Sequence, residues 1–289
     1  MKSVIIYYFS GTGNTALVAE MFQQSFTELG LAVDLVPIED VLKGKRNAQV
    51  SNYDLVGFGS PVIGFTTPPV MKRFLRGLAG QTGKKAFIFR TAGGVAPINY
   101  NASRPMKTIL ARKGFDVFHE RLFSISSNWI NRFDDDVIVN LTESTKRKVQ
   151  LMCNALMNNE AKHYQTTFPQ RLQMGIVARV APLFFHVAGR DLTVDAKVCT
   201  RCGLCEKKCP AINIRLLDGH VRFGWQCNCC LRCVYACPDE AIHFKHLSTF
   251  AVKGGYHIRD ILAHPAPVAA DQAKPAPRFY QGYLADDSL

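Results

Sequence analysis

The sequence predicts two structural units: an α/β domain with a parallel sheet, followed by a small α+β domain organised by cysteines. Over residues 1–165, short apolar runs alternate with amphipathic helical segments, which is typical of parallel strands joined by right-handed crossovers. Nine of the ten cysteines lie between residues 199 and 237, and eight of these form two copies of one spaced pattern. A length of 289 residues with 47% hydrophobic content is enough for two domains with a substantial core.

Five strands are expected in the first unit. Residues 4–9 form a continuous apolar run, as in a strand that is covered on both faces. The other strands are expected at 31–37, 55–60, 85–90 and 115–124. Helical spacing of apolar residues predicts the intervening helices at 14–29, 69–78, 106–112 and 137–157.

Residues 166–192 are expected to form a helical connector. Its apolar residues recur at helical spacing, which predicts a helix that packs one domain on the other, with a helix on a membrane surface as the alternative. These residues are Leu172, Ile176, Val180, Phe184 and Val187. Pro182 predicts a break or kink inside this helix.

The cysteine-rich unit is expected at 193–250 and contains a repeat with a period of 28 residues. Each copy has the pattern C-x2-C-x2-C-x3-C-P, which is typical of proteins with two iron–sulfur clusters. The fourth cysteine of each copy is expected to start a short helix that leads away from its own loop, with the proline in the first turn, so that it reaches the other cluster. One 4Fe-4S cluster is therefore expected on Cys199, Cys202, Cys205 and Cys237, and the second on Cys209, Cys227, Cys230 and Cys233.

Zinc is the alternative metal for this unit, but zinc sites typically use two C-x2-C pairs and do not require a third cysteine at the same spacing plus a fourth. Residues 195–247 resemble the two-cluster bacterial ferredoxins. Cys229 is outside the repeat and is expected to be a free thiol, and Cys153 lies in an apolar helix and is expected in the core. Residues 251–289 are expected to form a flexible tail, because the chain beyond His264 is rich in proline and alanine.

The loop after the first strand is expected to bind a phosphate group. It has no lysine, unlike a nucleoside-triphosphate loop, and two glycines rather than the three of a dinucleotide loop. Hydroxyl groups and the free N–H groups of the following helix suit one phosphate monoester. The residues are Ser10, Gly11, Thr12, Gly13, Asn14 and Thr15.

This loop resembles the phosphate loop of flavodoxins, and two later loops agree with the resemblance. They follow the third and fourth strands, where flavodoxins place the two flanks of the flavin ring, beside the switch point of a sheet with strand order 2-1-3-4-5. The resemblance implies bound FMN and a Gly64 carbonyl that can turn toward flavin N5. The loop residues are Ser60, Pro61, Val62, Ile63, Gly64, Thr91, Ala92, Gly93 and Gly94.

Other residues near the expected flavin have less defined roles. Ile63 stands where some flavodoxins carry an aromatic residue, and Tyr100 is a candidate to supply the missing ring. Residues 126–129 follow the fifth strand and are expected either to approach the flavin or to form a polar loop anchored by Trp129. Tyr100, His119 and Arg132 are candidate proton donors, although none stands in a recognisable catalytic pattern.

Residues 1–250 as a whole resemble the ferrodoxins, a bacterial family in which a flavodoxin domain is fused to a ferredoxin domain. The resemblance implies FMN and two 4Fe-4S clusters in a redox protein of anaerobic metabolism, and it implies no single substrate. We expect a protein that couples one-electron transfer by the clusters to two-electron transfer by the flavin. The alternatives are a flavin-dependent reductase of a small organic substrate and, on the strength of Cys229 alone, a redox-sensing regulator.

The net charge of +12 is compatible with a solvated basic surface, and the alternatives are an acidic redox partner protein, an anionic small-molecule substrate or a nucleic acid. Lysine and arginine are dispersed along the chain, which argues against a nucleic-acid partner. No uninterrupted apolar run reaches the roughly 18 residues of a membrane span, and the N-terminal segment lacks a signal-peptide cleavage site. Clustered cysteines suit a reducing compartment, so the protein is expected in the cytoplasm.

Overall fold

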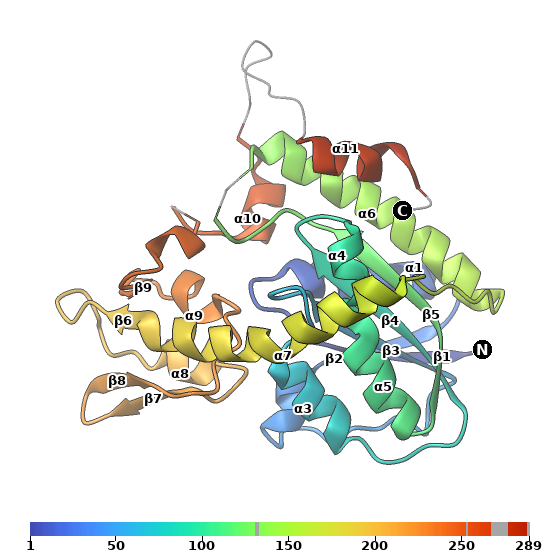
Figure 1. Cartoon of the computed structure of the whole chain (residues 1–289), viewed down its shortest axis with the longest axis horizontal. Coiled ribbons are helices and arrows are strands. Elements are labelled where there is room, and N and C mark those ends of the chain that lie inside the picture. The colour runs from blue at the N-terminus through green and yellow to red at the C-terminus, as the bar shows by residue number, and fades with distance from the viewer. Residues whose placement is uncertain (131–132, 253, 267–276, 288–289) are drawn as a thin grey trace, which may run out of the picture.

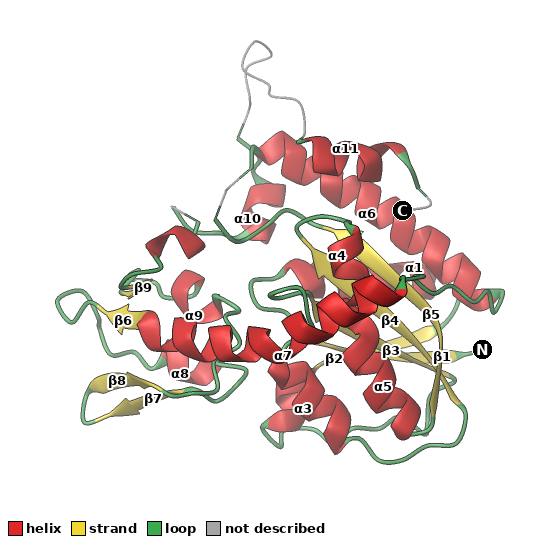
Figure 2. Ribbon diagram, viewed as in Figure 1, coloured by secondary structure: helices red, strands yellow, loops and turns green. Residues whose placement is uncertain are grey.

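A five-stranded parallel sheet forms the centre of the first unit, in the order β2-β1-β3-β4-β5 (Figure 2). The computed structural model describes residues 1–130, 133–252, 254–266 and 277–287. The strands are β1 (Ser3–Tyr8), β2 (Ala32–Pro37), β3 (Leu55–Pro61), β4 (Lys84–Ala92) and β5 (Phe115–Ser124). The expected strand order of 2-1-3-4-5 and all five expected strands are confirmed, to within two residues at each end.

Helices cover both faces of this sheet. On one face α1 (Asn14–Glu28) contacts α6 (Asp135–Met157), and on the other α3 (Pro69–Gly77) contacts α5 (Arg104–Arg112). These four helices were expected from their spacing. Three short helical segments were not expected: α2 (Ile38–Leu42), α4 (Pro97–Tyr100) and η1 (Asn101–Ser103). Central strands are buried on both faces, and the rings of Phe87 and Phe89 lie directly over Gly57 and Gly59 of β3, where a Cβ would collide with them.

The connector is a single helix, α7 (Phe168–Asp191), which continues past Pro182 without a break (Figure 1). Thr167 and Gln170 form a capping box at its start. The prediction that its apolar stripe packs the domains together is wrong. The helix buries Met174, Ala181, Phe185 and Ala188 instead, while the predicted stripe is exposed to solvent.

Close contacts fix α7 to both units. A Cβ added at Gly64 would lie 2.9 Å from the ring of Phe185, and one added at Gly189 would lie 2.2 Å from the Cβ of Cys227. The helix therefore packs tightly on a loop of the first unit and on a cysteine loop of the second. Gly64 of the loop and Gly189 of the helix permit these approaches, because a Cβ at either position would collide with its neighbour.

The second unit contains two antiparallel strand pairs and two short helices. β6 (Leu192–Val194) pairs with β9 (Ile242–Phe244), and β7 (Ile214–Leu217) pairs with β8 (His220–Phe223). The helices are α8 (Leu204–Lys208) and α9 (Arg232–Tyr235). One prediction needs correction: the fourth cysteine of each repeat follows its short helix rather than starting it, because the helix begins at the loop that carries the first three cysteines.

The C-terminal segment packs on the first unit. It comprises η2 (Ser248–Phe250), α10 (Ile258–Ala263) and α11 (Arg278–Ala285), of which α10 and α11 contact α6. Tyr256, Tyr280 and Tyr283 are fully buried. The expectation of a flexible tail over 251–289 is therefore wrong for the described residues, and 267–276 and 288–289 lie outside them.

Candidate cofactor sites

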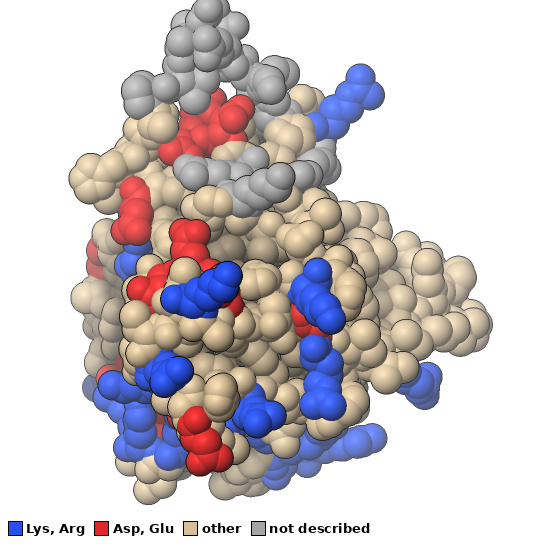
Figure 3. Space-filling model, turned by 90° about the vertical axis from the view of Figure 1, so that its left-hand side faces the viewer, with Lys and Arg blue, Asp and Glu red and all other residues tan. Residues whose placement is uncertain are grey.

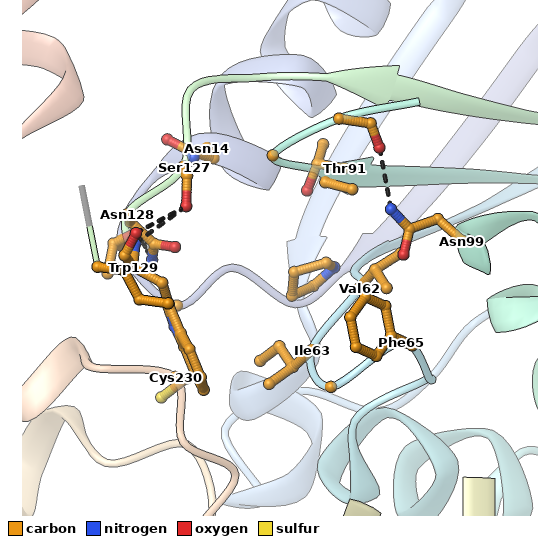
Figure 4. A pocket seen from close by; sticks show the side chains of 18 of the residues that line it. Asn14, Val62, Ile63, Phe65, Thr91, Asn99, Ser127, Asn128, Trp129 and Cys230 are labelled. Atoms are coloured by element: carbon orange, nitrogen blue, oxygen red, sulfur yellow. Dashed lines mark hydrogen bonds between the residues drawn. The ribbon is translucent and has the colours of Figure 1, made fainter. Parts of the chain in front are cut away.

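A cavity of about 940 Å³ lies at the carboxyl edge of the sheet and is called here the sheet-edge cavity (Figure 4). The loops after β1, β3, β4 and β5 line it, because parallel strands bring their carboxyl ends to one edge. All the predicted loop residues line the cavity except Gly13 and Ser60. Residues 126–129 all line the cavity, and Trp129 also packs on Phe250.

The predicted phosphate loop is held by hydrogen bonds to its neighbours. Gly13 has a φ of 106°, which favours glycine, and its N–H donates to Ser10 Oγ over 3.2 Å. The Thr15 and Thr91 hydroxyl oxygens are 2.7 Å apart, which ties the loop to the end of β4. Asn128 Nδ2 donates to Thr12 Oγ1 over 2.7 Å. The loop thus presents the N-terminus of α1, with no acidic residue in its first turn, to the cavity.

Two further polar residues, Ser126 and Asn99, line the cavity. Ser126 is buried, and its Oγ has no hydrogen-bond partner among the described residues. Because an unpaired buried hydroxyl is costly, its position fits a polar ligand in the cavity. Asn99 Nδ2 donates to the Gly94 carbonyl over 2.9 Å and so shapes the loop after β4.

Asn99 is positioned by a buried ion pair beneath the cavity. Arg90 Nη1 donates to the Asn99 carbonyl over 2.6 Å, and Arg90 Nη2 lies 3.6 Å from Glu120 Oε2. Burial alone raises the pKa of Glu120, but the charges of Arg90 and Lys107 outweigh it and lower that pKa. The carboxylate is therefore ionised and holds Arg90 beneath α4.

Two of the three candidate proton donors, Tyr100 and His119, are not among the residues that line the cavity. Tyr100 stacks on Tyr164, with ring centroids 4.4 Å apart, so it does not supply an aromatic flank. His119 is buried, and its Nδ1 lies 2.7 Å from the Glu160 carbonyl oxygen. Burial lowers the pKa of His119, which keeps the ring neutral. Arg132 lies outside the described residues.

One wall of the cavity was not foreseen from the sequence. Residues of α7 and η2 close the side opposite the sheet, and Phe250 packs edge-on against Trp129 with ring centroids 5.3 Å apart. Phe184 lies 5.7 Å from Phe250, centroid to centroid. Three residues of the apolar stripe predicted for this helix, Ile176, Val180 and Phe184, form part of the wall, although the stripe was expected to pack the two domains together. The lining residues of α7 are Ile176, Val177, Val180, Ala181 and Phe184.

The eight repeat cysteines surround two smaller spaces in the second unit. The inner set, next to α7, comprises Cys209, Cys227, Cys230 and Cys233, and the outer set comprises Cys199, Cys202, Cys205 and Cys237. Each set thus takes three cysteines from one repeat and the fourth from the other, as predicted for two clusters. Cys229 is buried beside the inner set, with its N–H donating to Cys227 Sγ over 3.3 Å, and Cys153 is buried in the core.

Each cysteine set contains four thiols. Among the described residues, no three His, Cys, Asp or Glu side chains converge closely enough to hold one metal ion. A four-iron cluster places its thiolates farther apart than one ion does, and each set supplies the four that it needs.

The comparisons with known proteins agree with this division. A family model for a 4Fe-4S dicluster domain matches residues 191–238. This chain joins a flavodoxin-like domain to a 4Fe-4S dicluster domain. No match was found among curated proteins.

Solved structures similar to the flavodoxin-like domain have low identity to it, so the strand order itself establishes the fold. A flavodoxin from the domain Archaea is 16% identical over 54% of this chain and 99% of its own, with a TM-score of 0.39. Oxidised Flavodoxin 1 from Bacillus cereus is 15% identical over 54% and 98%, with a TM-score of 0.41. Rubredoxin oxygen:oxidoreductase from Desulfovibrio gigas is 19% identical over 56% and 38%, with a TM-score of 0.37.

The flavodoxin-like domain and the dicluster domain meet at Gly11 and Cys230. A Cβ at Gly11 would lie 2.5 Å from the carbonyl oxygen of Cys230, so the phosphate loop lies directly against the inner cysteine loop. Cys230 lines both the sheet-edge cavity and the space inside the inner set. In Figure 4, Cys230 and Trp129 border the cavity on the side away from Phe65.

Arg232 links the two domains beside this contact. Its Nε donates to the Gly11 carbonyl over 3.1 Å, and its Nη2 donates to the Ser10 carbonyl. Its Nη1 pairs with Glu39 Oε1 over 2.6 Å and also donates to the Lys208 carbonyl over 3.1 Å. One guanidinium therefore joins the phosphate loop, α2 and the chain next to Cys209.

Two tyrosines strengthen the junction from the C-terminal half of the chain. The Tyr235 hydroxyl donates to the Asn128 carbonyl over 2.8 Å, and the Tyr256 hydroxyl donates to Asn14 Oδ1 over 2.9 Å. Burial raises the pKa of Tyr235 to about 12, so this tyrosine stays protonated and remains a donor. Sequence reasoning missed both residues, because they lie in segments assigned to another domain and to the tail.

Proposed function

We propose that this protein carries electrons inside one chain between two 4Fe-4S clusters and FMN. The observation that carries the proposal is the double role of Cys230, which borders both the sheet-edge cavity and the inner cysteine set. The loop of residues 10–15 would hold the phosphate, and the loops after β3, β4 and β5 would hold the ring.

The proposed groups differ in the number of electrons that they exchange. Iron–sulfur clusters exchange single electrons, whereas FMN exchanges one or two, so the chain would couple one-electron to two-electron transfer. The protein residues supply position: Gly11 permits close approach of the two sites, and Arg232 fixes their spacing. Fusion also keeps donor and acceptor at a high effective concentration.

We further infer an order of sites from their exposure. Cys202 of the outer set is exposed, whereas the inner set lies against α7 and the phosphate loop. Lys197 and Arg201 are exposed beside the outer set, and Figure 3 shows more Lys and Arg than Asp and Glu over the lower part of this end of the molecule. An acidic redox partner protein in the cytoplasm would therefore exchange electrons with the outer cluster first.

Anaerobic purification followed by rapid-mixing spectroscopy tests the proposal. We expect about eight irons and one FMN per chain, and a one-electron donor should bleach the cluster absorbance before the flavin is reduced. A preparation without FMN, or a flavin whose reduction does not depend on the clusters, would contradict the proposal.

A reductase of a small organic substrate is the second candidate, and the size of the cavity favours it. Its 940 Å³ is near the upper end of ligand sites, which span roughly 300–1,000 Å³. The apolar wall of α7 faces the flavin loops across this space. Steady turnover of a small apolar acceptor by the purified protein alone would favour the reductase over the carrier.

A further inference from the structure

Helix α7 carries a row of large apolar side chains that is exposed to solvent. Phe168 is 77% exposed, Leu172 is 60% exposed and Leu183 is 65% exposed. Together with Ile176, Val180 and Val187, they recur every three or four residues, which places all six on one face along the whole helix. We call this row the α7 ridge; its members are Phe168, Leu172, Ile176, Val180, Leu183 and Val187.

The ridge has no role in holding the domains together. The opposite face of α7 does that work through Ala181, Phe185 and Ala188, all of which are buried. In Figure 1, α7 runs across the front of the molecule. An apolar row of this length on a helix that is already packed indicates an interaction surface.

Bound flavin would leave most of the ridge uncovered. Ile176 and Val180 line the sheet-edge cavity, but Phe168, Leu172, Leu183 and Val187 do not. The middle of the ridge therefore lies at the cavity, and its two ends extend beyond the cavity in both directions along the helix.

The charged side chains that α7 exposes beside the ridge are arginines, namely Arg171, Arg179 and Arg190. The one acidic residue of α7 is Asp191 at its C-terminus, which accepts hydrogen bonds from the backbone N–H groups of His246 and Leu247. At the end of the ridge, the Arg190 guanidinium lies 4.1 Å from the centroid of the Trp225 ring, and Trp225 is 59% exposed. Arginines beside an apolar face, with an exposed tryptophan at its end, are typical of helices that lie in the interface of an anionic membrane.

The helix is suited to lying along a membrane and not to crossing it. By length and composition α7 is the one helix among the described residues that could span a membrane. Crossing would require Phe185 and Gly189 to leave their contacts with Gly64 and Cys227. Lying flat, its 24 residues would contact lipid over about 36 Å while those contacts remain.

We propose that the α7 ridge docks on an anionic lipid surface, with the mouth of the sheet-edge cavity facing the membrane. A second copy of this chain is a poorer occupant, because a symmetric contact between two ridges would bring together the same three arginines of each copy. Anionic headgroups, in contrast, complement these arginines and the net charge of +12. The proposal does not depend on electron transfer.

Vesicle flotation with the full-length protein, purified without oxygen, tests this surface. Vesicles of phosphatidylcholine alone are compared with vesicles that also contain phosphatidylglycerol. The double variant Leu172→Ser and Leu183→Ser removes two ridge side chains that do not line the cavity. The control Leu151→Ser changes a leucine of α6 that is also exposed and helical. Iron and flavin content establish that each variant is folded.

We expect the wild type to float with the phosphatidylglycerol vesicles and the double variant to bind them at least about tenfold more weakly, which corresponds to about 1.4 kcal/mol. Leu151→Ser should bind as the wild type does. Binding to neither vesicle, or equal binding by the double variant, overturns the proposal. So does a dimer in solution that the ridge substitutions dissociate, because the occupant would then be a second copy.

Discussion

Replacing Gly11 with alanine perturbs the contact between the phosphate loop and the inner cysteine loop. The new Cβ would lie 2.5 Å from the carbonyl oxygen of Cys230 and 3.1 Å from the Cβ of that residue. Gly11 is not among the glycines with a positive φ, so alanine meets no backbone strain there and the collision is the whole cost. Because the closest atom belongs to the backbone, one of the two loops must move.

The size of the effect follows from the cost of overpacking. An extra carbon in a packed contact costs about 1–3 kcal/mol. If the phosphate loop moves, this cost appears as a weaker affinity for FMN, by roughly 5- to 150-fold. The cysteines keep their loop conformation in that case, so the iron content should stay at the wild-type value.

The assay is an anaerobic titration of flavin-free protein with FMN, followed by flavin fluorescence, with iron measured in the same samples. Gly80→Ala is the matched control, because a Cβ at Gly80 meets no atom within 4 Å. Wild-type FMN affinity in Gly11→Ala, together with a wild-type rate of flavin reduction by the clusters, would refute the argument that this contact joins the two sites.

Three further predictions concern the cysteine sets, the link between the domains and acid stability. Cys209→Ala should lose the inner cluster and Cys237→Ala the outer cluster. Because only the inner set adjoins the cavity, rapid mixing should show fast flavin reduction in Cys237→Ala and not in Cys209→Ala. Arg232→Gln should lower the free energy of unfolding by about 2 kcal/mol in urea titrations, because Glu39 and three backbone carbonyls lose the guanidinium donor. Replacing the exposed Arg215 with Gln should not lower it. Burial lowers the pKa of His119, so its contribution to stability is complete above about pH 6.5 and falls at lower pH. His119→Gln should therefore lose less stability than the wild type between about pH 7.5 and about pH 5.5 in urea unfolding, and equal losses would contradict this.

The sheet and the cavity loops were predictable because their signals are local. Continuous apolar runs define buried strands, and parallel strands bring their following loops to one edge, so Ser10, Pro61 and Thr91 could be placed together without coordinates. The grouping of the eight cysteines followed from repeat spacing in the same way.

The face of α7 was mispredicted because periodicity reports that a helix has an apolar side but not what that side contacts. The packed face includes the small residues Ala181 and Gly189, which carry little hydrophobic signal, and Gly189 permits close approach to Cys227. The C-terminal segment was mispredicted because Pro and Ala dominate its composition. Its buried tyrosines, Tyr256, Tyr280 and Tyr283, are few and widely spaced.

The Arg232 side chain restricts how this molecule can use its two halves. A hinge motion that parted them would have to break its bonds to Ser10, Gly11 and Glu39 together. Electron carriers that swing a tethered module between docking positions need a domain contact that opens easily. The contact held by Arg232 does not open easily. Throughput should then be governed by how often an external donor collides productively with the molecule, and should scale with that donor's concentration and fall as ionic strength rises.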